Sequence, residues 1–195
     1  MTEITLSPEQ SHAADAVGAW LKTRDKPYFI LHGPAGSGKS TIALFLSQLH
    51  NGPTYFMVYT GKGAEVLRRK GMPATTVHQR IYLPTVERHS EAQDLEQELL
   101  TCEDEKRERR IRKRLEELYQ PDFVLRPISP FASNGLIVLD ECSMMAKRES
   151  EDLLSFGLPV LVLGDPGQLS PIEGTGYFNG RPDFLLTAPV LGLND

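Results

Sequence analysis

A glycine-rich segment that ends in lysine and serine has the composition and spacing of a phosphate-binding loop. The run Gly33-Pro-Ala-Gly-Ser-Gly-Lys-Ser-Thr41 fits the pattern G-x-x-x-x-G-K-[ST]. Glycines allow backbone N–H groups to wrap around phosphate oxygens where a Cβ would obstruct them. We expect Lys39 to reach the β- and γ-phosphates of a nucleotide, and the Ser40 hydroxyl to bind Mg²⁺. The residues predicted to bind the nucleotide here are Gly33, Pro34, Ala35, Gly36, Ser37, Gly38, Lys39, Ser40 and Thr41.

Two adjacent carboxylates, Asp140 and Glu141, directly follow the apolar run at 136–139. The carboxyl end of a buried strand is where an open α/β sheet presents its ligand-binding residues. Asp140 is therefore expected to hold Mg²⁺, and Glu141 to act as the general base that activates an attacking water. The alternative is an acidic pair that caps the next helix. A catalytic glutamate at this position favours hydrolysis of the nucleotide over phosphate transfer to a second substrate.

A third segment, Gly164-Asp-Pro-Gly-Gln-Leu169, follows the apolar run at 160–163. A glutamine amide both donates and accepts hydrogen bonds, so Gln168 is a candidate to contact the γ-phosphate and the attacking water together. The alternative is a tight turn built from Gly, Asp and Pro.

The elements that must position these segments alternate along the chain. Apolar runs without alternation at 28–31, 136–139 and 160–163, with a weaker one at 54–59, are typical of strands buried on both faces. Helical stretches that include 40–49 and 63–70 lie between them, and Ser7-Pro-Glu-Gln10 has the pattern of a capped helix start. This order predicts an α/β fold: a parallel sheet with helices on both faces.

Composition limits the classes of protein to consider. With 195 residues, of which 40% are hydrophobic and 24% charged, the chain fits one folded domain over 1–195 rather than a disordered one. The net charge of −5 means that nucleic-acid binding needs a local basic patch. Cys102 and Cys142 form no metal-binding or disulfide pattern. No apolar run approaches the ~20 residues of a membrane span, and no secretory signal is present, so a reduced cytoplasmic setting is expected.

The region at about 86–120 departs from this alternation, because more than half of residues 91–117 are charged. Its apolar residues recur at helical spacing, at Leu95, Leu99 and Cys102 and again at Ile111, Leu115 and Leu118. We predict a charged helical insertion. The basic run at 106–114 has two interpretations, an arm that contacts DNA or a partner and a solvated helix with internal salt bridges. Interleaved glutamates favour the second.

Taken together, these segments resemble the first RecA-like domain of superfamily 1 DNA helicases, on the RecD-like and Dda-like branch. Leu6-Ser-Pro-Glu-Gln10 is similar to the Q motif of that family, which implies that Gln10 contacts the adenine of ATP. The run 33–41 is similar to motif I, Leu139-Asp-Glu-Cys-Ser-Met144 to motif II, and the segment from Gly164 to motif III. The resemblance extends from about Leu6 to Thr187.

Two further segments are similar to motifs that contact single-stranded DNA. Tyr59-Thr-Gly-Lys-Gly-Ala64 looks like motif Ia, a strand-end loop, and Ala74-Thr-Thr-Val-His78 matches the A-x-T-[IV]-H signature that follows it. The resemblance implies DNA contacts by Thr60, Gly61, Lys62, Gly63, Thr76 and His78. The ordinary alternatives are a solvated loop charge for Lys62 and a core or capping role for His78.

The resemblance breaks after Thr187, where the family continues with Glu, a hydrophobic residue and His-Arg-Gln, followed by a second RecA-like domain. Here the chain reads Ala-Pro-Val-Leu-Gly-Leu-Asn-Asp195. An arginine supplied to the γ-phosphate raises rates by ~10³ to 10⁵ in comparable sites. We therefore expect the second RecA-like domain to be absent from this sequence. Three explanations stay open: a truncated or frameshifted helicase gene, a fragment of a longer protein, or a small protein completed by a partner. By itself the chain is expected to bind ATP and Mg²⁺, hydrolyse ATP weakly and unwind nothing.

These observations predict a RecA-like P-loop NTPase with a charged helical insertion. The function they favour is the N-terminal ATP-binding and hydrolysing motor domain of a DNA helicase that binds single-stranded DNA and acts in DNA replication, repair or recombination. Its catalytic residues would be Lys39, Glu141 and Gln168. One alternative is a non-catalytic ATP-dependent module that binds DNA or protein, a truncated relic of a helicase. Another is an unrelated P-loop NTPase that acts on RNA or protein.

Overall fold

The computed structural model describes residues 4–84, 89–102, 104–119, 123–141, 143, 145–165, 177–178 and 180–187. The chain divides into two compact units. One comprises Met1–Ile81 together with Ile128–Asp195, and the other comprises Tyr82–Pro127.

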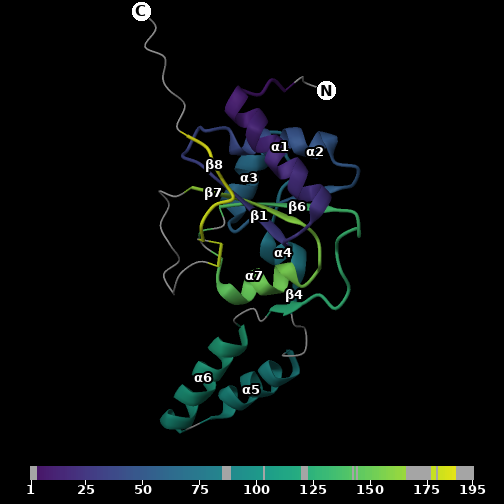
Figure 1. The fold of residues 1–195 in the computed structure, drawn as a ribbon. Helices are drawn as coiled ribbons and strands as arrows, with labels where there is room; N and C mark the ends of the chain where they lie inside the picture. The colour runs from purple at the N-terminus through teal and green to yellow at the C-terminus, as the bar shows by residue number, and fades with distance from the viewer. Residues whose placement is uncertain are drawn as a thin grey trace, which may run out of the picture. The chain divides into compact units, whose positions relative to one another are not determined.

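The first unit is built on a six-stranded parallel sheet with the strand order β3-β2-β6-β7-β1-β8 (Figure 1). The strands are β1 (Tyr28–His32), β2 (Thr54–Val58), β3 (Thr75–Thr76), β6 (Leu136–Asp140), β7 (Val160–Gly164) and β8 (Phe184–Leu185). The four longest occupy the centre and correspond to the four apolar runs, so the prediction of buried strands is confirmed. The two-residue strands β3 and β8 form the edges.

Helices cover both faces of this sheet, as predicted. The helices of this unit are α1 (Pro8–Thr23), α2 (Lys39–Leu49), α3 (Gly61–Arg69), α4 (Val77–Ile81) and α7 (Lys147–Leu154). Figure 1 shows α1, α2 and α3 on one side of the sheet and α4 and α7 on the other. The chain therefore has the α/β architecture in which ligands bind at the carboxyl ends of the strands.

Alternate strand residues face opposite layers of helices. One core cluster joins the strands to the first three helices. Its strand residues include Leu31, Val58, Val138 and Leu161, and its helix residues include Val17, Ile42 and Leu67. The intervening strand residues, which include Ile30, Met57, Ile137 and Leu139, are also buried. Burial on both faces explains why these strands are continuous apolar runs.

The start of α1 is fixed by the predicted capping box. Gln10 N donates to Ser7 Oγ at 3.3 Å, while Ser7 N donates to Gln10 Oε1 at 3.0 Å. Pro8 occupies the first turn, where its missing N–H costs nothing. Further along the helix, Trp20 is buried against Phe29, and its indole N–H donates to the Lys26 carbonyl at 2.9 Å. The capping box places the Gln10 side chain beside the loop that follows β1.

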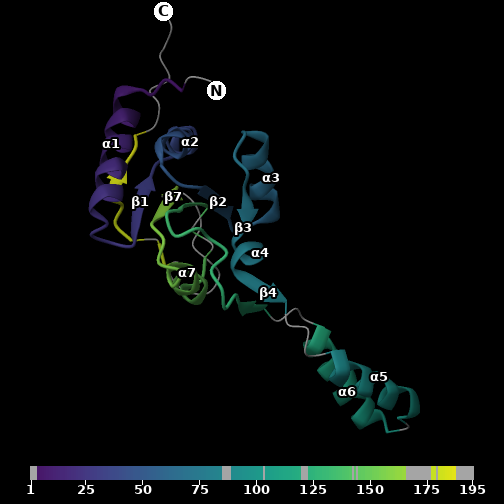
Figure 2. The ribbon, with the colours of Figure 1, turned by 90° about the vertical axis from the view of Figure 1, so that its right-hand side faces the viewer.

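The second unit contains the charged helices and a short β ladder. Helices α5 (His89–Thr101) and α6 (Glu105–Tyr119) lie side by side in Figures 1 and 2, and strands β4 (Tyr82–Pro84) and β5 (Phe123–Leu125) pair antiparallel. Five of the six residues predicted to recur on one face pack together, and the side chain of the sixth, Leu118, lies outside the described residues. Ala92, Ile111 and Leu115 are buried, and Leu95, Leu99 and Cys102 pack against them. The three-residue strands carry too short a pattern to be predicted from sequence.

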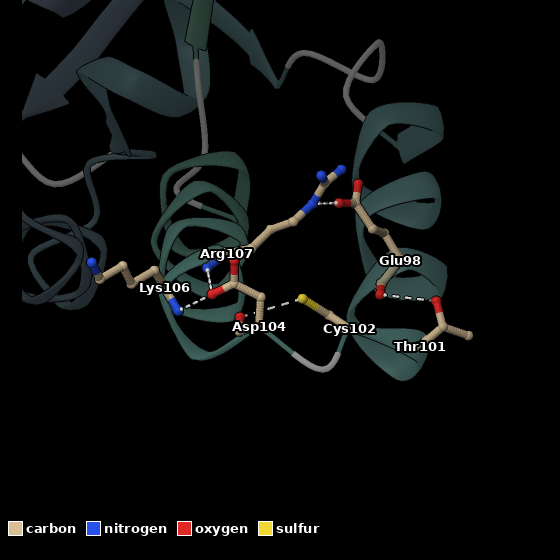
Figure 3. Close-up of polar contacts among 6 residues, drawn as sticks. All are labelled: Glu98, Thr101, Cys102, Asp104, Lys106 and Arg107. Carbon is tan, nitrogen blue, oxygen red and sulfur yellow. Dashed lines mark hydrogen bonds and ion pairs between the residues drawn. The ribbon is translucent and has the colours of Figure 1, made fainter.

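Polar contacts hold the turn between α5 and α6 (Figure 3). The Asp104 carboxylate accepts from the backbone N–H groups of Lys106 at 2.8 Å and Arg107 at 3.4 Å, which caps the start of α6. Arg107 Nε donates to Glu98 Oε1 of α5 at 2.5 Å. Arg112 pairs with Glu108 within α6 at 2.7 Å. These ion pairs favour the interpretation of a solvated, salt-bridged helical pair, although exposed pairs stabilise it little.

Candidate nucleotide site

The glycine-rich loop connects β1 to α2 and presents the N-terminus of that helix at the carboxyl edge of the sheet (Figure 2). Gly33 N donates to the Gly164 carbonyl of the neighbouring strand β7 at 3.1 Å. Gly36 and Gly38 have φ angles of +81° and +90°, which L side chains rarely adopt. Lys39 is the first residue of α2. A helix N-terminus with free N–H groups in a glycine-rich loop is suited to bind an anion.

The loop has features that an anionic ligand would satisfy. The Ser37 hydroxyl is buried and has no hydrogen-bond partner among the described residues. A Cβ at Gly33 would lie 2.5 Å from Ser37 Oγ, so the close approach of backbone and hydroxyl requires glycine. An unpartnered buried hydroxyl is costly, and an acceptor such as a phosphate oxygen would relieve the cost if the loop brought the two together. The residues present therefore fit a bound nucleotide phosphate.

The Lys39 ammonium lies within the loop. Its Nζ donates to the carbonyl oxygens of Gly33 at 2.6 Å and Pro34 at 2.9 Å. Burial lowers the pKa of Lys39, the carboxylates of Asp165 and Asp140 oppose this, and the charge of Lys70 adds to the lowering. Lys39 is therefore a partly desolvated cation, which interacts with an anion more strongly than a solvated one does.

The predicted acidic pair ends β6. Burial raises the pKa of Asp140, and the Glu141 N–H, which donates to Asp140 Oδ1 at 2.9 Å, opposes this together with Lys39 and Lys70. Glu141 has a φ of +56°, uncommon for a non-glycine residue. Non-glycine residues with a left-handed backbone persist only where the surrounding structure holds them there, and they cluster at functional sites.

A cavity of about 230 Å³ brings these groups together. Its lining comprises Ala35, Gly36, Lys39 and Ser40 from the loop and α2; Gly63, Val66, Leu67 and Lys70 from α3 and its C-cap; and Val58, Asp140, Glu141, Leu163 and Asp165 from the strands and their ends. The main predicted phosphate, metal and base residues thus share one cavity. A larger cavity of about 760 Å³ lies between α1 and α2, with Asp15 and Phe45 in its lining, and contains none of them.

Two charged residues of the smaller cavity were not predicted from the sequence. Asp165 follows β7 directly, so its place at the carboxyl end of a buried strand was a usable signal. Lys70 follows α3, and only the packing of that helix brings it to the cavity. Gln168 lies outside the described residues, as does the rest of 166–176.

Gln10, the residue of the Q-like motif, contacts the phosphate loop directly. Its Nε2 donates to the Ser37 carbonyl at 3.3 Å. A Cβ at Gly38 would lie only 2.1 Å from the same nitrogen, so the side chain passes over this glycine. The start of α1 is therefore joined to the loop through one side chain.

The motif Ia-like segment follows the end of β2 and enters α3, which begins at Gly61, two residues before the helical stretch predicted at 63–70. Thr60 is the N-cap of α3, and its Oγ1 accepts from Gly63 N at 3.0 Å. Gly61 and Lys62 are exposed in the first turn, while Gly63 is buried. A Cβ at Gly63 would lie 2.7 Å from Glu141 Oε2, which places this turn against the acidic pair.

The other two residues expected to contact DNA also have protein partners. Thr76 Oγ1 accepts from Gln79 N at 3.2 Å at the start of α4. His78 Nε2 lies 3.0 Å from Glu149 Oε1 of α7, and its ring packs edge-on against Tyr59. Burial raises the pKa of Tyr59, and the nearby Glu149 charge contributes. His78 thus pairs and packs with other side chains of the protein, and DNA contact at Thr76 and His78 stays a prediction.

The fold and the glycine-rich loop define a P-loop domain with a RecA-like architecture. The profile of a family described as an AAA domain matches residues 5–181, and the chain belongs to that family. Curated protein sequences give no match. No helix among the described residues has the length and apolar character needed to cross a membrane.

Solved structures with a similar fold include helicases. The Pif1 helicase from Candida albicans aligns with a TM-score of 0.51 and 19% identity, over 95% of this chain and 40% of that one. Bacteroides Pif1 bound to ssDNA aligns with a TM-score of 0.50 and 17% identity, over 95% and 42%. A structure described as two coordinating Pif1 helicases unwinding forked dsDNA aligns with a TM-score of 0.50 and 18% identity, over 95% of this chain and 44% of that one. The chain thus spans less than half the length of these neighbours, and at these identities the likeness shows the fold.

Proposed function

We propose that this chain is the ATP-binding and ATP-hydrolysing motor domain of a DNA helicase. One observation carries the proposal: the phosphate-loop lysine Lys39 lines a single cavity with the acidic pair Asp140 and Glu141. The family assignment supports it, and so do structural neighbours described as Pif1 helicases, one of them bound to ssDNA.

Within this proposal the phosphate loop and Lys39 hold the β- and γ-phosphates of ATP. Ser40 and Asp140 hold Mg²⁺, which usually binds through one or two carboxylates and the substrate phosphates and keeps several waters. The partial burial that lowers the pKa of Lys39 also strengthens its attraction for phosphate. When bound, ATP supplies the phosphoanhydride bond that is broken.

Glu141 is the proposed general base. It adjoins the metal-binding candidate Asp140 and lines the same cavity, so it is placed to accept a proton from a water that attacks the γ-phosphate. Gln168 is proposed, from its sequence position, to contact the γ-phosphate. Gln10, fastened to the loop through Ser37, is proposed to contact the adenine.

Single-stranded DNA is proposed to contact the first turn of α3 and the start of α4. The residues concerned are Thr60, Gly61, Lys62, Gly63, Thr76 and His78. The first turn of α3 contacts Glu141 through the Thr60 side chain. DNA bound at this turn would therefore be separated from the proposed base by a single side chain. A second RecA-like domain, in a longer chain or a partner, is proposed to complete the motor, and unwinding belongs to that assembly.

The experiment that tests the proposal is steady-state ATP hydrolysis with and without single-stranded DNA, for the natural chain and for Glu141→Gln. We expect slow turnover that DNA stimulates, and its loss in Glu141→Gln with ATP binding retained. Glu65→Gln, an exposed change on α3, is the matched control. Undiminished turnover in Glu141→Gln would remove Glu141 as the base. Tight ATP binding with no turnover under either condition would favour the non-catalytic binding module.

A further inference from the structure

Three consecutive basic residues end helix α3, and they differ in what they contact. Arg68 donates to the Ala74 carbonyl at 2.9 Å, and Arg69 pairs with Glu65 at 2.5 Å. Lys70 instead lines the nucleotide cavity, together with Lys39 and Asp140. The third cation thus has a different environment from the two before it.

Helical geometry accounts for this placement. The residues of α3 and its C-cap that line the cavity are Gly63, Val66, Leu67 and Lys70, which follow the i, i+3, i+4, i+7 spacing of one helix face. Lys70 is the C-cap, and its backbone N–H donates to the Leu67 carbonyl at 3.0 Å. Gly63, at the other end of this face, adjoins Glu141. The face therefore runs along the cavity from the proposed base to Lys70.

The charges of the cavity make a second cation useful. Asp140, Glu141 and Asp165 supply three carboxylates, while Lys39 and Lys70 supply two ammonium groups. The charge of Lys70 affects the pKa of both Lys39 and Asp140. Burial is the main cause of the lowered pKa of Lys39 and of the raised pKa of Asp140, and the Lys70 charge lowers the pKa of each group. A flexible, exposed ammonium at this edge has the reach to meet a phosphate without a large desolvation cost.

We propose that Lys70 is a γ-phosphate ligand that stabilises the charge which builds up there as ATP is hydrolysed. This inference rests on the proposed function. In the step, water oxygen forms a bond to the γ-phosphorus, the bond to the β–γ bridging oxygen breaks, and ADP leaves. Glu141 takes the proton of the attacking water. A cation at the γ-phosphate is a recurring part of such sites, and Lys70 supplies one from this chain.

The ordinary alternative is that Lys70 only complements the dipole at the end of α3. The two roles differ in a measurable way. A helix-end charge affects folding and treats ATP and ADP alike, because it contacts neither. A γ-phosphate ligand discriminates between the two nucleotides, since ADP lacks the group that it binds.

The test is the affinity for Mg²⁺-ATP and Mg²⁺-ADP, measured by titration calorimetry in a Glu141→Gln background that prevents turnover. Adding Lys70→Gln is expected to weaken ATP binding by about tenfold, the usual size of one charge-assisted hydrogen bond. ADP binding is expected to change less than about twofold. Lys70→Arg should keep most of the preference for ATP, and the control Arg69→Gln should alter neither affinity.

The proposal would be overturned if Lys70→Gln left the ratio of ATP affinity to ADP affinity unchanged, whether neither affinity fell or both fell by the same factor. Failure of the proposed function has a separate signature in the same assay. If Lys39→Ala bound both nucleotides as tightly as the natural chain, the phosphate site itself would be misassigned, whatever Lys70 did.

Discussion

The Thr60 hydroxyl lies 3.5 Å from Oε2 of Glu141. This contact joins the N-cap of α3 to the end of β6, two segments that are far apart in the sequence. The same hydroxyl accepts a hydrogen bond from Gly63 N at 3.0 Å, so one side chain both caps the helix and meets the proposed base. The first turn of α3 and the acidic pair are thus one structural unit at the sheet edge.

Thr60→Val should destabilise the domain, because valine has a similar shape but no hydroxyl to cap α3. We expect the free energy of unfolding to fall by about 1 kcal/mol, the usual cost of a lost N-cap. Urea denaturation measures this change. Thr60→Ser keeps the hydroxyl and should stay close to the natural chain. Equal stability of the valine and serine variants would show that the cap does not operate.

Gly38→Ala should be destabilising for two reasons, both of which arise from the added Cβ. A left-handed backbone costs a residue with a Cβ about 1–2 kcal/mol. In addition, the new Cβ would lie 2.1 Å from Gln10 Nε2 and displace that side chain from Ser37. Denaturation of Gly38→Ala, Gln10→Ala and the double variant separates the two effects. Gly38→Ala should cost less in the Gln10→Ala background than in the natural chain, because the side chain that the new Cβ would meet is absent there.

Gly18→Ala is the matched control for that change. Gly18 lies within α1, and a Cβ there would meet nothing within 4 Å. Alanine in a helix interior is more stable than glycine by about 0.5–1 kcal/mol. The two glycine-to-alanine changes should therefore have opposite signs. If Gly38→Ala were also stabilising, the loop would not have the left-handed conformation that positions it for phosphate.

Asp140→Asn should stabilise the nucleotide-free domain at neutral pH. Burial raises the pKa of Asp140, so the folded chain holds its proton to higher pH than the unfolded chain does. Stability therefore falls as the pH rises from the ordinary aspartate range to the raised pKa, and stays lower above it. Each unit of increase corresponds to about 1.4 kcal/mol.

Thermal unfolding of both forms between pH 4 and 8 checks this prediction. The advantage of asparagine should be greatest at neutral pH and shrink as the pH falls toward 4, because a growing fraction of Asp140 in the natural chain is protonated there. Mg²⁺-ATP should then stabilise the natural chain more than the variant, because the variant lacks the metal-binding carboxylate. An advantage that did not vary with pH would mean that Asp140 is not desolvated as the structure indicates.

How far the sequence predicted this molecule depends on the range of the interaction concerned. The run 136–139, which forms all but the last residue of β6, is apolar and buried on both faces, and the loop at 33–38 has glycines where the backbone needs them, so both were visible locally. The strand Thr75–Thr76 has two residues and exists only because it pairs with β2. Lys70 could not be assigned to the site, because its place depends on how α3 packs.

The most direct test of the central claim is calorimetric titration of Mg²⁺-ATP into the natural chain, Lys39→Ala and the surface control Lys22→Ala. We predict saturable binding to the natural chain and to Lys22→Ala, and loss of at least about tenfold in affinity in Lys39→Ala, because a charge-assisted contact to phosphate is removed. Equal affinity for all three would contradict the assignment of residues 33–41 as the nucleotide phosphate site.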